Sequence, residues 1–125
     1  ISVVNDQIGT PTSAMALAEL TAKVVAKGRE HIYEFLRKHQ GLYNLTCLGR
    51  ANWYEFASVI RNKLQAQGVA VARLKAISAA EYPTAARRPM FSVLNNSKFE
   101  HEFDISIPEW SAAFIEVFQA TKATP

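Results

Sequence analysis

The sequence predicts an α/β domain, built as an α+β-like lobe of three to four helices with a few short strands. Apolar residues recur at helical spacing in three separate stretches, and short runs rich in β-branched residues lie between them. The length of 125 residues allows one domain with an ordinary hydrophobic core. With 49% hydrophobic and 20% charged residues, the composition is that of a globular protein and not of a disordered or fibrous one.

Residues 1–4 are strand-like, and a helix is expected to begin near residue 13. Pro11 presets a helical φ angle, and the hydroxyl of Thr12 or Ser13 can accept a hydrogen bond from a free N–H group of the first turn. Gly28 is the expected end of this helix. Its apolar face is predicted to consist of Ala14, Leu17, Ala18, Thr21 and Val25.

The next two elements are shorter. A short apolar stripe in residues 32–36 predicts either that the helix resumes or that a new one begins. Residues 41–47 have the pattern of a strand in which Tyr43, Leu45 and Cys47 share one face. A cysteine on an apolar face is more often a small buried hydrophobic residue than a nucleophile, and we expect Cys47 to be buried.

A second long helix is expected to begin after Asn52. Asn52 and Glu55 have the spacing of a capping box, and Gly68 is the expected end. Residues 69–77 are a further candidate strand. The apolar positions of the helix are Trp53, Phe56, Ala57, Ile60 and Leu64, among which Trp53 is expected to be a core anchor.

Two helices are expected toward the end of the chain. The polar residues 95–97 predict the start of a short helix, with Leu94 and Phe99 as apolar anchors. Ser106 and Glu109 have capping-box spacing before the last helix, and residues 122–125 are expected to fray. The apolar stripe of that helix consists of Trp110, Ala113, Phe114, Val117 and Thr121.

Residues 78–89 show no periodicity, and they contain Tyr82, Arg87 and Arg88. Irregular segments of about 12 residues are uncommon inside compact domains and are often functional. Paired arginines suit a phosphate group, because the planar guanidinium donates two parallel hydrogen bonds. From composition alone, two solvated arginines are the simpler interpretation.

Charge and cysteine content exclude several classes of protein. The net charge of +3 is spread along the chain, so an anionic ligand is allowed, whereas the dense basic stripe of a nucleic-acid-binding protein is missing. A single cysteine excludes an intrachain disulfide and a cysteine-based zinc site. The sequence contains neither a membrane-length apolar run nor a signal peptide, and we expect a cytoplasmic protein that does not bind membranes.

No catalytic set is visible in the sequence. The five glycines are widely scattered, so they do not form a phosphate-binding turn, and no Tyr-x-x-x-Lys motif occurs. His31 and His39 are expected at the surface of a charged helical stretch, and His101 is expected to contact the neighbouring Glu100 or Glu102. We therefore expect no catalysis by this chain alone.

Four stretches together resemble one family. They are residues 4–12 (Val-Asn-Asp-Gln-Ile-Gly-Thr-Pro-Thr), residues 41–45 (Gly-Leu-Tyr-Asn-Leu), residues 53–57 (Trp-Tyr-Glu-Phe-Ala), and residues 82–89 (Tyr-Pro-Thr-Ala-Ala-Arg-Arg-Pro) running into residues 92–99. In this order they resemble the C-terminal part of the dTDP-4-dehydrorhamnose reductases, which are extended short-chain dehydrogenase/reductases.

The resemblance implies a reduction in which NADPH or NADH delivers hydride to the 4-keto group of dTDP-4-dehydro-β-L-rhamnose, giving dTDP-L-rhamnose for bacterial surface polysaccharide. In the family, an N-terminal Rossmann domain binds the cofactor and carries the catalytic threonine and the Tyr-x-x-x-Lys motif. Residues 1–125 are then expected to be the C-terminal sugar-nucleotide-binding lobe. This lobe is expected to lack the Rossmann domain, to bind no cofactor itself and to be inactive alone.

The same resemblance implies roles for individual residues. Arg88 first and Arg87 second are expected to contact the diphosphate of the dTDP-sugar. Asp6, Gln7 and Tyr82 are expected to line the nucleotide or sugar pocket.

Two expectations about partners follow. A lobe separated from its Rossmann domain exposes apolar surface, which predicts self-association. The family also includes a non-catalytic regulatory subunit of methionine adenosyltransferase, so a binding subunit is the alternative to a reductase.

Overall fold

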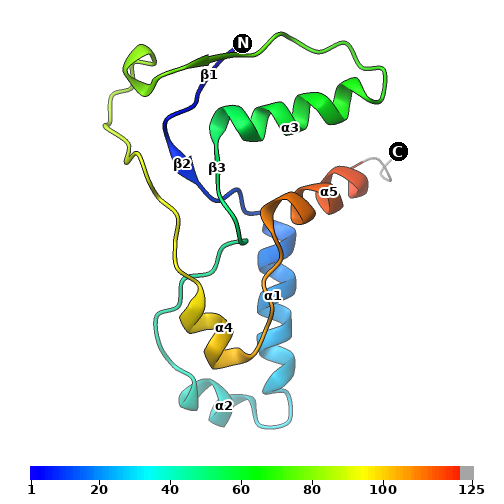
Figure 1. Ribbon diagram of the computed structural model, residues 1–125. Helices are drawn as coiled ribbons and strands as arrows, with labels where there is room; N and C mark the ends of the chain where they lie inside the picture. Colours follow the sequence, from blue (N-terminus) through cyan, green and yellow to red (C-terminus); the bar gives the residue numbers. More distant parts are fainter. Residues whose placement is uncertain (122–125) are drawn as a thin grey trace. The chain divides into compact units, whose positions relative to one another are not determined.

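The computed structural model describes residues 1–121, which contain five α-helices, four short β-strands and one 3₁₀ turn, η1 (Figure 1). The predicted class, an α/β lobe of helices with a few short strands, is confirmed. The chain divides into two compact units, each made of two separate stretches. Unit 1 comprises Ile1–Gly9 and Arg50–Val93, and unit 2 comprises Thr10–Gly49 and the chain from Leu94 onward.

Unit 1 contains two small sheets and one long helix. Strand β1 (Ser2–Val4) pairs in parallel with β4 (Lys75–Ile77), with Val4 opposite Ile77. Strand β2 (Ile8–Gly9) pairs antiparallel with β3 (Ala51–Asn52), which leads directly into helix α3 (Trp53–Gln65). The candidate strand at residues 69–77 is thus confirmed only for its last three residues, because β1 offers a partner of only three residues.

Helix α3 begins at the predicted capping box. Glu55 N–H donates to Asn52 Oδ1 (2.8 Å), and Asn52 N–H donates to Glu55 Oε2 (2.9 Å). The helix ends at Gln65, and Gly68 follows with a φ of +77°. The expectation that Trp53 is a core anchor is wrong, since its side chain is 54% exposed. Helical side chains lean toward the N-terminus, so the side chain of the first residue extends past the end of the helix.

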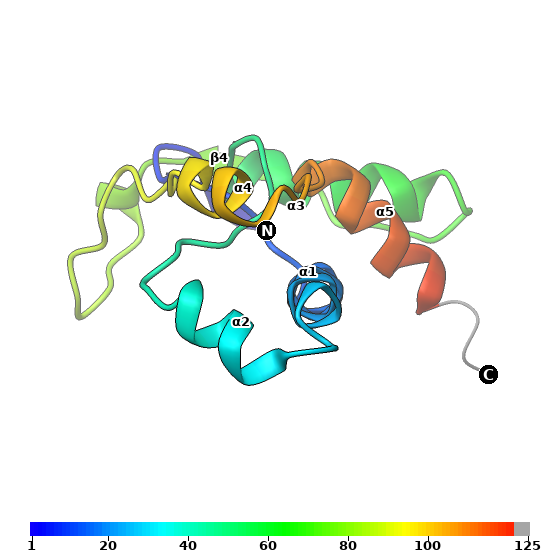
Figure 2. The same cartoon turned by 90° about the horizontal axis from the view of Figure 1, so that it is seen from below.

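Unit 2 contains the other helices, which are α1 (Ala14–Lys27), α2 (Ile32–Lys38), α4 (Ser97–Phe103) and α5 (Trp110–Ala120). Figure 2 looks nearly down the axis of α1 and shows α2 and α4 to its left. The larger core cluster of this unit joins α1 to α4 and to the segment that follows α4. It consists of Leu20, Phe99, Phe103, Ile105 and Ile107, and a smaller cluster consists of Ala16, Cys47 and Ala113.

Helix α1 begins and ends as predicted but buries a different face. Ser13 caps the helix by accepting a hydrogen bond from Ala16 N–H (3.0 Å), and Gly28 is its C-cap. The buried residues are Ala16 and Leu20, whereas four of the five predicted face residues, all except Leu17, are exposed. Apolar residues recur at helical spacing on both faces, and the face with Leu20 is the one that packs against Phe99 and Phe103.

Residues 41–47 form no strand, although the predicted face is correct. Tyr43 and Leu45 pack against the larger cluster, and Cys47 is 1% exposed, as expected for a buried hydrophobic residue. The segment is held by a side chain instead of a strand. Asn96 Nδ2 donates to Thr46 O (2.9 Å), and Thr46 N–H donates to Asn96 Oδ1 (3.2 Å). The side-chain amide of Asn96 therefore forms the hydrogen bonds that the backbone of a neighbouring strand would otherwise form.

The start of α4 is as predicted, with Asn96 as N-cap and Phe99 buried, but Leu94 is 48% exposed and is not an anchor. The capping box at Ser106 and Glu109 is wrong. Helix α5 begins only at Trp110, because the backbone just before it is extended and pairs with Leu48. Leu48 N–H donates to Pro108 O (2.8 Å), and Trp110 N–H donates to Leu48 O (3.0 Å). The prediction for residues 122–125 lies outside the described part.

Candidate functional site

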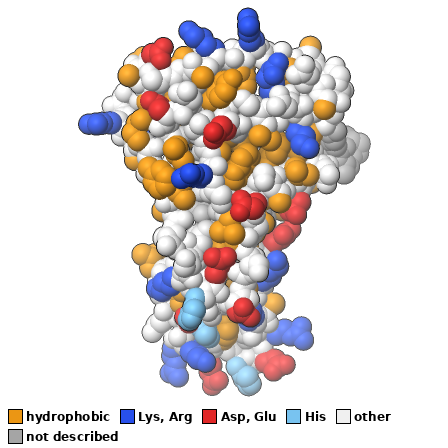
Figure 3. Space-filling view, viewed as in Figure 1, with side chains coloured by type: hydrophobic (Ala, Val, Ile, Leu, Met, Phe, Trp, Pro, Cys, Tyr) orange, Lys and Arg blue, Asp and Glu red, His pale blue; other side chains and the backbone are white. Residues whose placement is uncertain are grey.

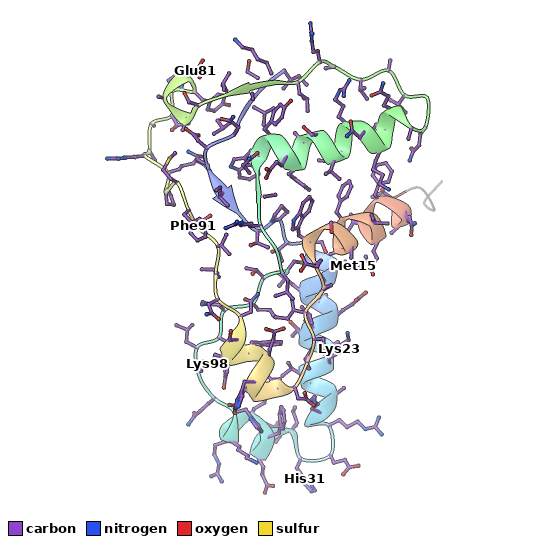
Figure 4. The ribbon with its side chains drawn as sticks, viewed as in Figure 1. Met15, Lys23, His31, Glu81, Phe91 and Lys98 are labelled. Atoms are coloured by element: carbon purple, nitrogen blue, oxygen red, sulfur yellow. The ribbon has the colours of Figure 1, made fainter. Side chains whose placement is uncertain are left out.

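All five residues predicted to bind substrate lie in unit 1, on two stretches that are distant in sequence. Asp6 and Gln7 lie between β1 and β2. Tyr82, Arg87 and Arg88 lie on residues 78–89, which we call the arginine loop. Figure 4 marks Glu81 near the start of this loop and Phe91 just after its end.

The first end of the arginine loop is fastened to the strand β1 and to Asp6. Asn5 N–H donates to Ile77 O (3.0 Å), which extends the β1–β4 pairing by one bond. Both carboxylate oxygens of Asp6 then accept the N–H of Ala79, at 2.9 and 3.0 Å. The side chain of Asp6 is therefore directed at the backbone of the loop.

The loop begins with the 3₁₀ turn η1 (Ala79–Glu81), which is closed by Ser78 and Glu81. Ser78 donates both its N–H and its hydroxyl to Glu81 Oε2, each at 2.8 Å. These two hydrogen bonds, in that order of importance, and the charge of nearby Lys75 lower the pKa of Glu81. Tyr82 follows the turn, and its N–H donates to Ala79 O (3.2 Å).

The second end of the arginine loop is fastened to β2. Ile8 N–H donates to Met90 O, and Ser92 N–H donates to Ile8 O, both at 2.9 Å. Gly9 lies close to this end of the loop, and a Cβ there would lie 3.0 Å from Ser92 Oγ, so a larger residue would require the Ser92 hydroxyl to shift slightly. The four residues 6–9 thus hold both ends of the loop.

Between its two ends, the arginine loop is open to solvent. Every residue from 80 to 92 is exposed, including Tyr82 at 53% and Phe91 at 57%. Arg87 and Arg88 form no hydrogen bond or ion pair with any of residues 1–121, so both guanidinium groups are available to an anion. Gln7 is half-buried between the two anchoring points, and its amide also has no hydrogen-bond partner in this part of the chain.

Comparison with known proteins identifies the family. The model of the RmlD substrate binding domain matches residues 1–123. The chain belongs to this family. It is 36% identical to the dTDP-4-dehydrorhamnose reductase of Escherichia coli (strain K12) over 114 residues, which are 88% of this chain and 36% of that protein. It is 32% identical to the spore coat polysaccharide biosynthesis protein SpsK of Bacillus subtilis, covering 95% of this chain and 36% of that protein.

Solved structures agree with this assignment. The dTDP-4-dehydrorhamnose reductase of Clostridium acetobutylicum superposes with a TM-score of 0.77 at 31% identity, covering 98% of this chain and 39% of that one. The reductase of Bacillus anthracis, solved in complex with NADP, gives a TM-score of 0.74 at 27% identity, with 96% and 38% covered. This RmlD substrate binding domain therefore spans somewhat more than a third of the length of the relatives it matches.

Of the three histidines of the RmlD substrate binding domain, only His31 lies as expected. His31 and His101 are exposed, but His39 is half-buried, and its Nδ1 lies 2.7 Å from Glu102 Oε1. The acid expected beside His101 therefore pairs with His39 instead, because α2 packs there through the ring contact between Phe35 and Phe103. Among residues 1–121, no three His, Cys, Asp or Glu side chains are grouped so that they could hold a metal ion.

Sequence reasoning missed one hollow, which lies in unit 2. This open hollow of about 540 Å³ is lined by Lys23, Ala26, Lys27, Asp104, Ile105 and Ser106. The only sequence signal was the pair of lysines four residues apart on α1.

Within residues 1–121, no helix combines the length and the apolar composition that crossing a membrane requires.

Proposed function

We propose that this chain binds the dTDP-sugar substrate of a dTDP-4-dehydrorhamnose reductase through the arginine loop. The observation that carries the proposal is a loop anchored at both ends that carries two unpaired arginines and an exposed tyrosine. A diphosphate needs donors that remain charged at any physiological pH, and arginine provides them. The names of the relatives support this choice of ligand.

In this proposal, Arg88 and then Arg87 donate to the diphosphate oxygens. The exposed ring of Tyr82 packs against the nucleotide or the sugar, and the free amide of Gln7 hydrogen-bonds to one of them. Asp6 belongs to the same site. The role of these residues is to bind and orient the 4-keto sugar, so that binding energy is used to hold the reacting carbonyl in place.

The reduction itself needs NADPH or NADH, and we propose that a dinucleotide-binding domain separate from residues 1–125 holds this cofactor. The two-stranded parallel sheet of β1 and β4 supports such a partner. Parallel strands normally lie inside larger sheets that helices cover on both faces. In unit 1 this sheet has only two strands. A doubly wound parallel sheet is the partner that would extend it.

Binding of dTDP to the 125-residue chain, measured by calorimetry, tests the substrate role. We expect weak binding that decreases with increasing salt, and an Arg88→Ala variant should bind roughly tenfold more weakly, as expected for the loss of one charge-assisted hydrogen-bond pair. The matched control is Arg73→Ala, which removes the same charge from an exposed position of unit 1. Equal affinities of the Arg88→Ala and Arg73→Ala variants would contradict the diphosphate role.

A second assay tests the division of labour. The 125-residue chain alone should not oxidise NADPH in the presence of dTDP-4-dehydro-β-L-rhamnose, whereas the same chain joined to a dinucleotide-binding domain of the family should do so. Turnover by the isolated chain would contradict the proposal that the catalytic residues lie elsewhere.

A further inference from the structure

The conformation of the arginine loop must be determined mainly at its two ends. Residues 80–92 are all exposed, so no buried side chain fixes the middle of the loop. Inside the loop, Thr84 Oγ1 donates to Ala86 O (2.8 Å), which shapes the tip but does not connect it to the rest of unit 1. The hydrogen bonds at the ends therefore decide where the loop places its guanidinium groups.

The two ends are held by different kinds of contact. At the second end, only backbone groups of Ile8, Met90 and Ser92 are needed, together with one bond from the Ser92 hydroxyl to Ile8 O (3.3 Å). At the first end, the bonds between Ser78 and Glu81 close the turn upon itself and connect it to nothing else. The carboxylate of Asp6 is the side chain that joins this turn to the segment between β1 and β2, across 73 residues of sequence.

The charge of Asp6 is unsuited to direct contact with a diphosphate, because two negative groups repel each other. Both of its oxygens already accept the N–H of Ala79. We propose that Asp6 is a positioning residue, whose carboxylate fixes the start of the arginine loop so that Tyr82 and the two arginines are preorganised for the nucleotide. This inference rests on the proposed function and gives Asp6 a role within that same site.

Calorimetry with dTDP on the 125-residue chain tests the inference. The Asp6→Ala variant should bind dTDP about three- to tenfold more weakly, which is the range expected when a capping carboxylate is lost. The Asp6→Asn variant retains an oxygen that can accept the Ala79 N–H, so it should restore most of the affinity. The matched control is Glu55→Ala, which removes a capping carboxylate from α3 in the same unit.

Hydrogen exchange at the Ala79 amide provides the second readout. We expect faster exchange in Asp6→Ala than in the unmodified chain, and unchanged exchange at this amide in Glu55→Ala. If folded Asp6→Ala binds dTDP as tightly as the unmodified chain, or if Glu55→Ala loses as much affinity, the inference is overturned while the proposed function stands. If the unmodified chain does not bind dTDP, the proposed function fails. An unchanged exchange rate at Ala79 in Asp6→Ala overturns the anchoring role independently of any ligand.

Discussion

At the residue scale, Asn96 is a buried polar side chain that connects two segments of unit 2. It is 5% exposed, and its amide exchanges hydrogen bonds with the N–H, the carbonyl and the hydroxyl of Thr46. A buried amide that is fully bonded fixes one register between two segments, and each partner left unsatisfied carries a desolvation cost.

Replacing Asn96 should therefore destabilise the protein strongly. We expect Asn96→Ala to lower the free energy of unfolding by about 2 kcal/mol, because the backbone of Thr46 loses its partners. Urea unfolding followed by circular dichroism measures the change. The control is Asn62→Ala on the exposed face of α3, for which we expect a change within about 0.5 kcal/mol. Equal stabilities of the two variants would refute the role of Asn96.

Substitutions at two glycines distinguish the effect of backbone strain from that of steric crowding. Gly49 and Gly68 have φ angles of +80° and +77°, a region that disfavours side chains. A Cβ at Gly68 would meet no atom within 4 Å, whereas one at Gly49 would meet the Glu109 carboxylate and would lie 3.0 Å from Trp110. Gly68→Ala should cost about 1 kcal/mol of stability, and Gly49→Ala should cost more. Thermal unfolding of both variants measures the difference, and a larger loss for Gly68→Ala would contradict this explanation.

At the element scale, η1 should respond to acid. Because the bonds from Ser78 lower the pKa of Glu81, the carboxylate stabilises the turn above the ordinary pKa of 4.5, and this contribution is lost as the pH falls through the lowered value. An NMR titration should place the midpoint of Glu81 below 4.5 and show the Ser78 amide moving with it. In Ser78→Ala, which removes the hydroxyl, the midpoint should rise. An unchanged midpoint in Ser78→Ala would contradict the contribution of the Ser78 hydroxyl to the lowered pKa of Glu81.

The elements also show which contacts can be predicted from neighbouring residues in the sequence and which cannot. The caps at Ser13 and at Asn52 with Glu55 were predictable, because donor and acceptor lie within three residues of each other. The partner of Thr46 was not, because it is a side chain 50 residues away. In the candidate site, the irregular arginine loop stood out in the sequence, but the hydrogen bond from the Ala79 N–H to the Asp6 carboxylate spans 73 residues and left no periodic signal.

At the scale of the whole molecule, much apolar surface remains exposed. The upper part of the view in Figure 3 shows several hydrophobic patches, whereas charged and histidine side chains cover the lower end. Large hydrophobic side chains that are more than half exposed include Ile1, Leu42, Trp53, Tyr82 and Phe91. Exposed apolar patches favour association.

We therefore expect the 125-residue chain to self-associate as its concentration rises. Light scattering over a range of concentrations should show an average mass above the 13.9 kDa of one chain. Joining the chain to a dinucleotide-binding domain of the family should reduce self-association, because part of the apolar area is then covered. A strict monomer at high concentration would contradict the expectation.

The burial of Cys47 makes its thiol a built-in probe of how often unit 2 opens. Its thiol is the only one in the sequence, it is 1% exposed, and the N–H of the same residue is held by the Thr12 hydroxyl (3.1 Å). A thiol reagent can react only after the segment around this sulfur has opened. The rate of labelling therefore reports how often unit 2 opens, with no probe added and no residue changed.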